Sequence, residues 1–328
     1  MSDHAKQLLR KFAGWLGSAA GLEKDDLRVL LDTLTREGTD AQKGAFLGLL
    51  NAHEGDRLAA VPVIVEAARF LREHPDMVRV SAPEGTIDIV GTGGDGASSF
   101  NVSTAAAFVA AGAGVKLDVP PKTIERAIRD AGVGFLWAPQ HHPAMKSWGP
   151  VRAELGFRTL FNLLGPLCNP AFVKRQVIGV YAREWVRPVA EVMRALGSEH
   201  VWVVHGSDGL DELTTTGPSF VAELKGGAIR EFEIRPEHAG LRQAEPQALR
   251  GGDATENAAT LRAILGPAAL RLARHQPIRD IVVLNAAAAL IVAGIASDLK
   301  AGAELAEIAI DSTASLAALD KLVRITST

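Results

Sequence analysis

The chain has little cysteine, few aromatic residues and almost no net charge. Of its 328 residues one is cysteine, Cys168, one is tyrosine, and aromatic residues make up 5%. A single cysteine excludes an intrachain disulfide framework and suits a reducing compartment. A formal net charge of −3 excludes a global cationic field of the kind that holds nucleic acid. We therefore expect no nucleic-acid partner, and an anionic substrate must be held by a local arrangement of residues.

The sequence also lacks long uninterrupted apolar runs. Residues 1–10 contain no hydrophobic segment typical of a signal peptide. The longest apolar run, 281–295, contains Asn285 and several alanines, so it predicts a buried helix rather than a membrane span. Hydrophobic residues make up 47% and charged residues 22%, as in ordinary globular proteins. These features predict a cytoplasmic protein with no membrane partner.

The first 75 residues show helical periodicity only. Apolar residues recur at spacings of three and four, as in Leu27, Leu30, Leu31 and Leu34. Asp40 is predicted to cap a further helix. Because no strand-like alternation interrupts this block, residues 1–75 are predicted to form a small all-helical domain.

Residues 76–328 show strands alternating with helices, which predicts an α/β domain with a mainly parallel central sheet flanked by helices. Gly226-Gly227 separates the last two strands, which are predicted to form a hairpin. The predicted strands span 86–90, 176–181, 201–205, 221–224 and 229–234. The predicted helices span 103–111, 187–196, 256–265, 281–293 and 302–322.

A glycine-rich segment, Gly91-Thr-Gly-Gly-Asp-Gly96, stands where a predicted strand ends and a helix begins. Glycines there let backbone N–H groups approach a phosphate, and the helix N-terminus adds partial positive charge. Asn101, Ser103 and Thr104 follow, with side chains suited to phosphate oxygens and a metal. The segment also satisfies the dinucleotide pattern G-x-G-x-x-G, although Asp95 would repel a bare pyrophosphate. A purely structural strand–helix turn is the third alternative.

Two adjacent acids, Asp211 and Glu212, follow the predicted strand 201–205. Ligands of open α/β sheets gather at the carboxyl ends of strands, and Mg²⁺ prefers carboxylates, water and substrate phosphates. No Walker lysine follows the glycine-rich segment, so a metal would have to compensate phosphate charge. The pair predicts an Mg²⁺ site, and the alternative is two surface acids on a solvated loop.

Segment 135–146 mixes aromatic, small and basic residues and contains His141-His142, with Arg152 beyond it. A guanidinium suits a planar carboxylate, to which it can form two parallel hydrogen bonds. The histidines have no companions at zinc-ligand spacing, so we expect no zinc site. Helix capping or packing is the alternative role for these histidines.

Together these segments resemble the anthranilate phosphoribosyltransferase family, which has a nucleoside phosphorylase-like fold. The resemblance runs in the family's order from residue 86 to the C-terminus, and the first 75 residues match more loosely. The matching strings are Asp88–Gly96, Phe100–Thr104, Gly134–Lys146, Pro150–Arg152, Thr159–Pro166, Asn169-Pro170, Lys174–Tyr181, Gly209–Glu212, Gly251–Ala254, Glu256-Asn257 and Asp280–Ala289.

The resemblance implies transfer of the phosphoribosyl group of phosphoribosyl diphosphate (PRPP) to the amine of anthranilate. The products are N-(5-phosphoribosyl)anthranilate and diphosphate, in tryptophan biosynthesis. It also implies a homodimer that associates through the helical domain. For PRPP it implies Gly91, Thr92, Gly93, Gly94, Asp95, Ser99, Asn101, Ser103 and Thr104; for anthranilate, His142, Arg152 and Pro166; for Mg²⁺, Ser103, Asp211 and Glu212.

The chain departs from this family at the Val115–Lys116 junction. In the family, a strand carrying Lys-His-Gly-Asn-Arg, a serine-rich turn and a helix follow the N-x-S-T motif. Here residues 112–115 run directly into 116–121, which resemble the sequence beyond that helix. Loss of the unit removes basic phosphate-binding residues and part of the anthranilate wall. It also leaves an unpaired sheet edge or forces a rearrangement, so we expect weaker folding and catalysis.

Three other functions stay open. A nucleoside phosphorylase shares the general architecture, but the Asp211-Glu212 pair and the segment from His142 to Arg152 speak against it. A non-catalytic relative that binds nucleic acid or a partner gains weight from the missing unit. An NAD-binding protein is disfavoured by Asp95.

Overall fold

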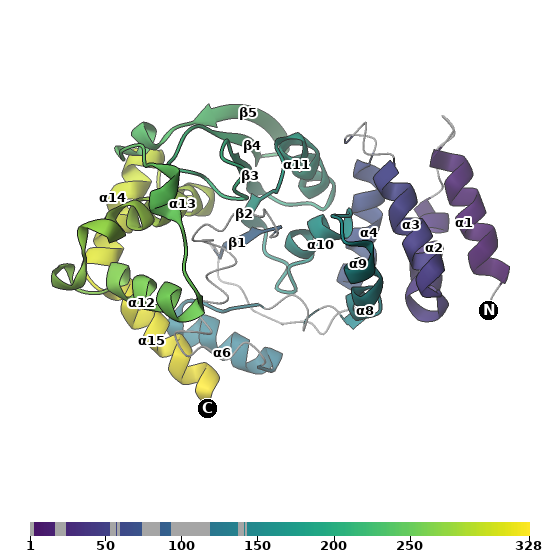
Figure 1. Ribbon diagram of the computed structural model, residues 1–328, viewed down its shortest axis with the longest axis horizontal. Helices are drawn as coiled ribbons and strands as arrows, with labels where there is room; N and C mark the ends of the chain where they lie inside the picture. The colour runs from purple at the N-terminus through teal and green to yellow at the C-terminus, as the bar shows by residue number, and fades with distance from the viewer. Residues whose placement is uncertain are drawn as a thin grey trace.

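The structure is a computed structural model that describes residues 3–16, 24–52, 57, 60–73, 86–92, 119–136, 141 and 143–328. Helices α1–α4 lie at one end of the molecule, the sheet in the middle and α12–α15 at the other end (Figure 1). The strands are β1 (Asp88–Gly91), β2 (Arg175–Gly179), β3 (His200–Gly206), β4 (Ser219–Lys225) and β5 (Ala228–Ile234). The α-helices are α1 (Asp3–Leu16), α2 (Lys24–Glu37), α3 (Asp40–Ala52), α4 (Val61–Glu73), α6 (Pro121–Ala131), α8 (Pro143–Lys146), α9 (Gly149–Leu155), α10 (Phe161–Leu167), α11 (Val186–Ala195), α12 (Ala254–Leu265), α13 (Gln276–Ala293), α14 (Leu299–Asp311) and α15 (Ala314–Ser327).

The sheet has the order β1-β2-β3-β4-β5. β1, β2 and β3 are parallel, whereas β3, β4 and β5 pair antiparallel. Gly91 lies opposite Gly179, and Gly179 opposite Val204, so three parallel strands end at one edge. The turn between β4 and β5 uses Gly226 and Gly227 at φ 57° and 82°, values that favour glycine in a tight hairpin. The α/β class and the hairpin are confirmed, and the sheet is mixed.

Both faces of the sheet are covered, as predicted. Val201 and Val203 of β3 belong to the hydrophobic cluster that contains the buried residues of α11. Trp202 and Val204 belong to the cluster that contains those of α13 and α14. Because successive side chains of a strand point to opposite faces, α11 covers one face and α13 the other.

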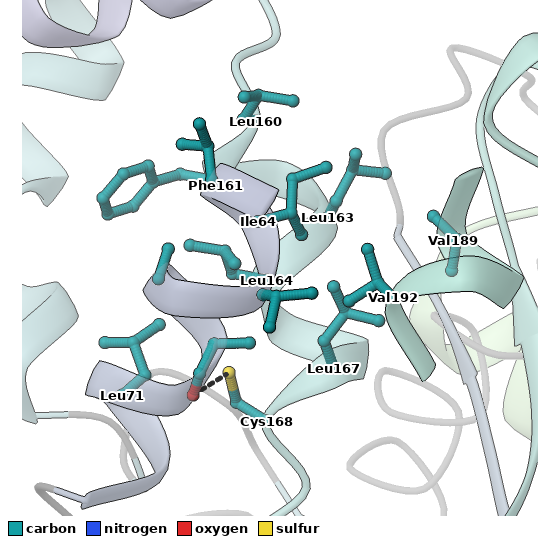
Figure 2. Close-up of a cluster of buried hydrophobic side chains, with 14 of the residues drawn as sticks. Ile64, Leu71, Leu160, Phe161, Leu163, Leu164, Leu167, Cys168, Val189 and Val192 are labelled. Atoms are coloured by element: carbon teal, nitrogen blue, oxygen red, sulfur yellow. Dashed lines mark hydrogen bonds between the residues drawn. The ribbon is translucent and has the colours of Figure 1, made fainter. Parts of the chain in front are cut away.

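The N-terminal helices share a hydrophobic core with the α/β part of the molecule. Figure 2 shows Ile64 and Leu71 of α4 in one cluster with Leu164 of α10 and Val192 of α11. Burial of each such side chain stabilises the folded state by about 1.5–3 kcal/mol. The two parts are therefore joined by a packed interface.

The helical character of the N-terminal part is confirmed for its described residues, with a correction at the start of α3. Thr39, and not Asp40, caps this helix. The Gln42 N–H donates to Thr39 Oγ1 (3.3 Å), and the Thr39 N–H donates to Gln42 Oε1 (3.0 Å), which is a capping box. The predicted domain boundary near residue 75 falls outside the described residues, so the division into domains 1–75 and 76–328 stays a prediction.

The prediction of a single helix over 302–322 is wrong, because the C-terminal segment forms two helices. α14 ends at Asp311 and α15 begins at Ala314. Between them Thr313 has φ 61°, a left-handed conformation that a right-handed helix cannot pass through. The predicted helix 103–111 lies outside the described residues.

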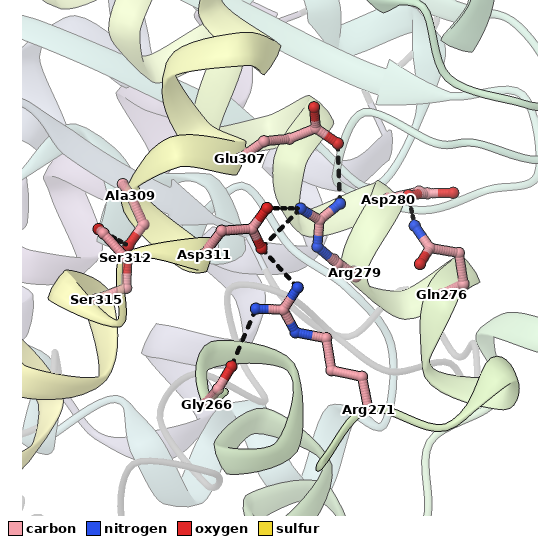
Figure 3. A network of polar contacts seen from close by, with 10 residues as sticks. All are labelled: Gly266, Arg271, Gln276, Arg279, Asp280, Glu307, Ala309, Asp311, Ser312 and Ser315. Atoms are coloured by element: carbon pink, nitrogen blue, oxygen red, sulfur yellow. Dashed lines mark hydrogen bonds and ion pairs between the residues drawn. The ribbon is translucent and has the colours of Figure 1, made fainter. Parts of the chain in front are cut away.

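A polar network holds α13 against α14 (Figure 3). The Arg279 side chain is 7% exposed and pairs with Glu307 (2.9 Å) and Asp311 (3.3 Å). Arg271 pairs with the same Asp311 and donates to the carbonyl oxygen of Gly266 (3.0 Å). Since loss of the partners of a buried charge is costly, the buried Arg279 guanidinium group and its two partly exposed acids hold α13 beside α14.

α13 is a core helix, although its composition would also suit a membrane span. The stretch Ala273–Ala293 is long enough to cross a bilayer, and its most apolar window of 18 residues has a mean hydropathy of 1.5, which the sequence had not led us to expect. However, 61% of its most apolar window is buried inside the molecule, and the helix packs on β2 and β3. The predicted buried helix is therefore confirmed.

Cys168 follows α10, and its Sγ donates to the carbonyl oxygen of Ala68 in α4 (3.8 Å; Figure 2). Burial raises the pKa of this thiol to about 12. Because the thiolate is the reactive form, we expect the folded protein to react with iodoacetamide at least about 100-fold more slowly than the unfolded protein. Mass spectrometry of timed labelling with and without guanidinium measures this difference. Rapid stoichiometric labelling of the folded protein would contradict the burial of Cys168.

Candidate active site

The candidate active site lies at the edge of the sheet where β1, β2 and β3 end. The Thr92 N–H donates to the carbonyl oxygen of Gly179 (3.0 Å), so the glycine-rich segment leaves the sheet beside the end of β2. The loop after β3 spans 207–218 and carries the acid pair. Three segments far apart in the sequence thus converge at the edge where ligands of open α/β sheets gather.

Asp211 packs directly against the ends of β1 and β2. A Cβ on Gly91 would overlap Asp211 Oδ2 and stand 3.0 Å from its Cγ, and a Cβ on Gly179 would overlap the Asp211 carbonyl oxygen. Asp211 and Glu212 are 1% and 3% exposed. The alternative of two surface acids is therefore wrong, and the carboxylate of Asp211 borders the first residue of the glycine-rich segment.

The side chain of Asp208 holds the acid-bearing loop in shape. Its Oδ2 accepts hydrogen bonds from Thr214 Oγ1 (2.6 Å) and Thr216 Oγ1 (2.7 Å), and its Oδ1 accepts one from the Leu210 N–H (3.3 Å). These bonds join residues before and after the acid pair. The pair is thus held within a hydrogen-bonded loop, which favours a preorganised charge arrangement.

The close contact between Gly179 and Asp211 predicts the effect of a Gly179→Ala substitution. The new methyl group would displace the loop, because the overlapping atom belongs to the Asp211 backbone. We expect a loss of stability of about 1–3 kcal/mol by denaturant unfolding and a roughly tenfold loss of activity. Gly48→Ala is the matched control, since a Cβ there meets nothing within 4 Å in a helix, and it should stabilise slightly. Equal behaviour of the two variants would show that the loop does not lie against β2.

The oxygen donors of this edge suit Mg²⁺. Asp211 and Glu212 carry carboxylate groups of the kind this ion prefers as ligands, and only a glycine at position 91 lets the Asp211 carboxylate approach the end of β1 this closely. Ser103, the third predicted ligand, lies outside the described residues. Among the residues that are described, no three histidine, cysteine or acidic side chains form a metal-binding cluster.

A cavity of about 390 Å³ begins beside this edge and extends toward α8, α9 and α10. Its lining includes Gly91 and Thr92 on the side of the sheet and Arg152, Asn162 and Pro166 on the side of the helices. A cavity of this size accommodates a small ligand. Residues predicted separately for PRPP and for anthranilate therefore face one space.

Arg152 lies on α9, and burial lowers the pKa of its guanidinium group. Among the described residues no carboxylate offsets this cost of burial. A half-buried guanidinium that faces a cavity is suited to a planar carboxylate of a ligand. Arg158, six positions further on, stacks on the ring of Tyr181 instead (4.6 Å to the centroid).

His141 and Lys146 also line the cavity, and neither was among the predicted site residues. His141 is 1% exposed. The sequence did contain a sign of its role, the pair His141-His142, but the family resemblance implied the second histidine as the binding residue. His142 itself lies outside the described residues.

Asp88, at the start of β1, is a further cavity residue that sequence reasoning did not single out. Its Oδ2 accepts a hydrogen bond from Gln176 Nε2 (2.9 Å), which also donates to the carbonyl oxygen of Pro166 (3.2 Å). Burial raises the pKa of the Asp88 carboxyl group, although hydrogen bonds from Asn169 and Gln176 oppose the shift. Through Gln176, Asp88 thus joins β1 to the cavity wall that contains Pro166.

The remaining predicted site residues fall outside the described part of the chain, and their roles stay predictions. They are Gly93, Gly94, Asp95, Ser99, Asn101, Ser103, Thr104 and His142.

Known proteins match this chain over nearly its whole length. Residues 84–118 and 113–316 match the model of the glycosyl transferase family, a/b domain. An anthranilate phosphoribosyltransferase from Rhodopseudomonas palustris is 45% identical, with 97% of this chain and 98% of the relative covered. The protein of that name from Parvibaculum lavamentivorans is 49% identical, with 95% and 96% covered. The chain belongs to the anthranilate phosphoribosyltransferase family.

Solved members of the family have the same fold. The anthranilate phosphoribosyltransferase of Thermus thermophilus superposes with a TM-score of 0.83 and 34% identity, and the whole of both chains is covered. The Saccharomyces cerevisiae enzyme in complex with PRPP and Mg superposes with a TM-score of 0.85 and 28% identity over 99% of each chain. The predicted family and fold are confirmed.

Family membership also bears on the missing strand–helix unit. The two matches to the family model overlap over residues 113–118, which contain the Val115–Lys116 junction. The alignment to the R. palustris relative has 345 positions, more than the 328 residues of this chain, so some residues of the relative have no counterpart here. In the described part of the sheet, β1 has a neighbouring strand on one side only. These observations agree with the departure found in the sequence.

Proposed function

We propose that this chain transfers the phosphoribosyl group of PRPP to the amine of anthranilate, with release of diphosphate, as a step of tryptophan biosynthesis. The observation that carries the proposal is the contact of Asp211 with Gly91 at one side of a cavity that has Arg152 at another. Relatives solved with PRPP and Mg and with 4-fluoroanthranilate support the choice of ligands.

The diphosphate is proposed to lie over the glycine-rich segment. Backbone N–H groups from Gly91 onward, with Asn101 and Thr104, would bind its oxygens, as glycine-rich strand–helix turns do. Ser103, Asp211 and Glu212 would hold Mg²⁺, which when bound supplies Lewis-acid stabilisation of the departing diphosphate. The hydrogen-bonded loop keeps both acids in place before substrate arrives, so little reorganisation accompanies reaction.

Anthranilate is proposed to lie at the helical side of the cavity. Arg152 would bind its carboxylate through two hydrogen bonds, and Pro166 would pack on its ring. The aromatic amine is neutral at pH 7 and can attack the anomeric carbon without prior deprotonation. The residues of the site therefore contribute chiefly by positioning and by stabilising charge.

The test is a fluorescence assay of purified protein with anthranilate, PRPP and Mg²⁺. We expect anthranilate fluorescence to fall only when all three are present, with equimolar release of diphosphate. An intact mass of 34.6 kDa shows beforehand that the purified protein has the mass of this chain, without further residues. Consumption of thymidine with phosphate, but not of anthranilate, would indicate a nucleoside phosphorylase instead.

The absence of the Lys-His-Gly-Asn-Arg unit is proposed to weaken catalysis. The unit would have supplied cations near the diphosphate, and its loss places more of the charge compensation on Mg²⁺. Insertion of the corresponding residues of the R. palustris relative at Val115–Lys116 should therefore raise activity. An insertion variant with unchanged activity would show that the unit is dispensable here.

A cytoplasmic homodimer that associates through α1–α4 completes the proposal. Family resemblance supports the homodimer, and the single buried cysteine suits the reducing cytoplasm. Light scattering of the purified chain should give twice the monomer mass, and a monomer at micromolar concentration would contradict this part.

A further inference from the structure

Asn285 of α13 binds the backbone immediately after the acid pair. Its Oδ1 accepts a hydrogen bond from the Leu213 N–H (3.1 Å), and its Nδ2 donates to the Leu213 carbonyl oxygen (2.9 Å). The other N–H of Nδ2 donates to the carbonyl oxygen of Ile281 in the same helix (2.9 Å). One side chain thus satisfies both backbone groups of the residue that follows Glu212.

The surroundings of Asn285 are apolar. It is 3% exposed, and its neighbours Val283, Leu284 and Ala288 in α13 are fully buried. An amide in such a place is unfavourable unless its polar atoms are hydrogen-bonded. Both of its N–H groups and its oxygen have backbone partners, so the geometry of the loop and the burial of Asn285 depend on each other.

The contact anchors the backbone directly after the acid pair, next to Thr214, whose hydroxyl group Asp208 binds. Leu213 is itself fully buried among residues of α13, and the following Thr214 N–H donates to Ser219 Oγ (2.9 Å). Within the pair, the backbone carbonyl of Asp211 lies against Gly179. Glu212 therefore stands between two anchored backbone positions, Asp211 and Leu213.

α13 is a firm support for this contact. It packs on β2 and β3, and Arg279 pairs it with α14 (Figure 3). A shift of Asn285 would have to carry the sheet or this ion-pair network with it. Through the Asn285 side chain, the position of α13 thus determines the position of the backbone next to the acid pair.

We propose that Asn285 is a positioning residue that sets Asp211 and Glu212 in the geometry that binds the divalent cation of metal-bound PRPP. This inference rests on the proposed function. Asn285 acts through the Leu213 backbone and touches neither substrate nor metal. Its role is to keep the affinity of the site for the cation high.

The substitution Asn285→Asp separates positioning from simple packing, because the two side chains have the same shape. A protonated aspartic acid can accept from the Leu213 N–H and donate to the Leu213 carbonyl, as asparagine does. An ionised aspartate has no donor and would face two carbonyl oxygens. Burial and the two carbonyl oxygens favour the neutral form and so raise the pKa of the new carboxyl group above the ordinary value of about 3.9. We therefore expect metal binding by Asn285→Asp to approach that of the wild type at low pH and to fall as pH rises.

The experiment measures Mn²⁺ binding in the presence of PRPP by electron paramagnetic resonance, without turnover, at about pH 5.5 and pH 8. Relative to the wild type at the same pH, Asn285→Asp should bind Mn²⁺ roughly tenfold more weakly at the higher pH, the loss of about one net hydrogen bond. At the lower pH the difference should largely disappear. Asn285→Ala, which removes the contact without adding charge, should bind more weakly at both pH values.

Val292→Ala is the matched control, since Val292 is fully buried two turns further along the same helix and in the same cluster as Leu213. It should lower the melting temperature without changing Mn²⁺ affinity. Wild-type affinity in both Asn285 variants would overturn the inference and leave the proposed function standing. If Asn285→Asp does not fold, Asn285→Ala decides by itself. A wild-type protein that binds no Mn²⁺ with PRPP would overturn both the inference and the proposed function.

Discussion

Asp211→Asn is expected to lower kcat about 100-fold or more, the size of effect seen when one preorganised charge-stabilising group is removed. The amide keeps the shape of the carboxylate and its packing against Gly91, but it is neutral and a poorer ligand for Mg²⁺. The apparent Mg²⁺ requirement should shift to higher concentration. Steady-state rates over a series of Mg²⁺ concentrations measure both effects.

Glu66→Gln is the matched control for this variant. Glu66 is a buried carboxylate of α4 that pairs with Arg69 (2.6 Å) and lies in a different part of the molecule from the acid pair. Its replacement should lower stability and leave kcat and the Mg²⁺ requirement unchanged. Near-normal turnover of Asp211→Asn at ordinary Mg²⁺ concentration would remove Asp211 from the metal site.

Arg152→Ala is expected to raise the KM for anthranilate about 30-fold or more, with a smaller effect on the KM for PRPP. Truncation of one partner of a buried, hydrogen-bonded charge pair costs about 2–5 kcal/mol, and 2 kcal/mol corresponds to roughly 30-fold in affinity. The effect should be confined to acceptors that carry a carboxylate. With aniline, which lacks this group, the wild type and the variant should therefore have similar KM values.

Arg158→Ala provides the comparison for this substitution. Arg158 stands on the same stretch of chain but stacks on Tyr181, so its loss should affect stability more than the KM for anthranilate. If Arg152→Ala left the KM for anthranilate unchanged, the carboxylate would have to be bound elsewhere.

Much of the fold was predictable because local patterns and tertiary structure agree. The apolar run 201–205 predicted β3, and the glycine pair 226–227 predicted the hairpin that follows it. Thr313 shows where local patterns fail. Apolar periodicity runs through the break between α14 and α15, and no glycine or proline marks it.

The candidate site was predictable in its residue types and less so in its spatial contacts. The acid pair was found because it follows a buried strand. Its contact with Gly91 and Gly179 was not foreseeable, because nothing in either segment alone shows which glycine meets Asp211. Asn285 was seen only as an interruption of an apolar run, since its hydrogen-bond partner lies in a loop distant in sequence.

The most direct test of the account is the position of the metal in crystals grown with PRPP and Mn²⁺, located by anomalous diffraction. We predict a peak about 2.1 Å from a carboxylate oxygen of Asp211 or Glu212, between these acids and the diphosphate. A peak bound to the diphosphate but distant from both carboxylates would contradict the account.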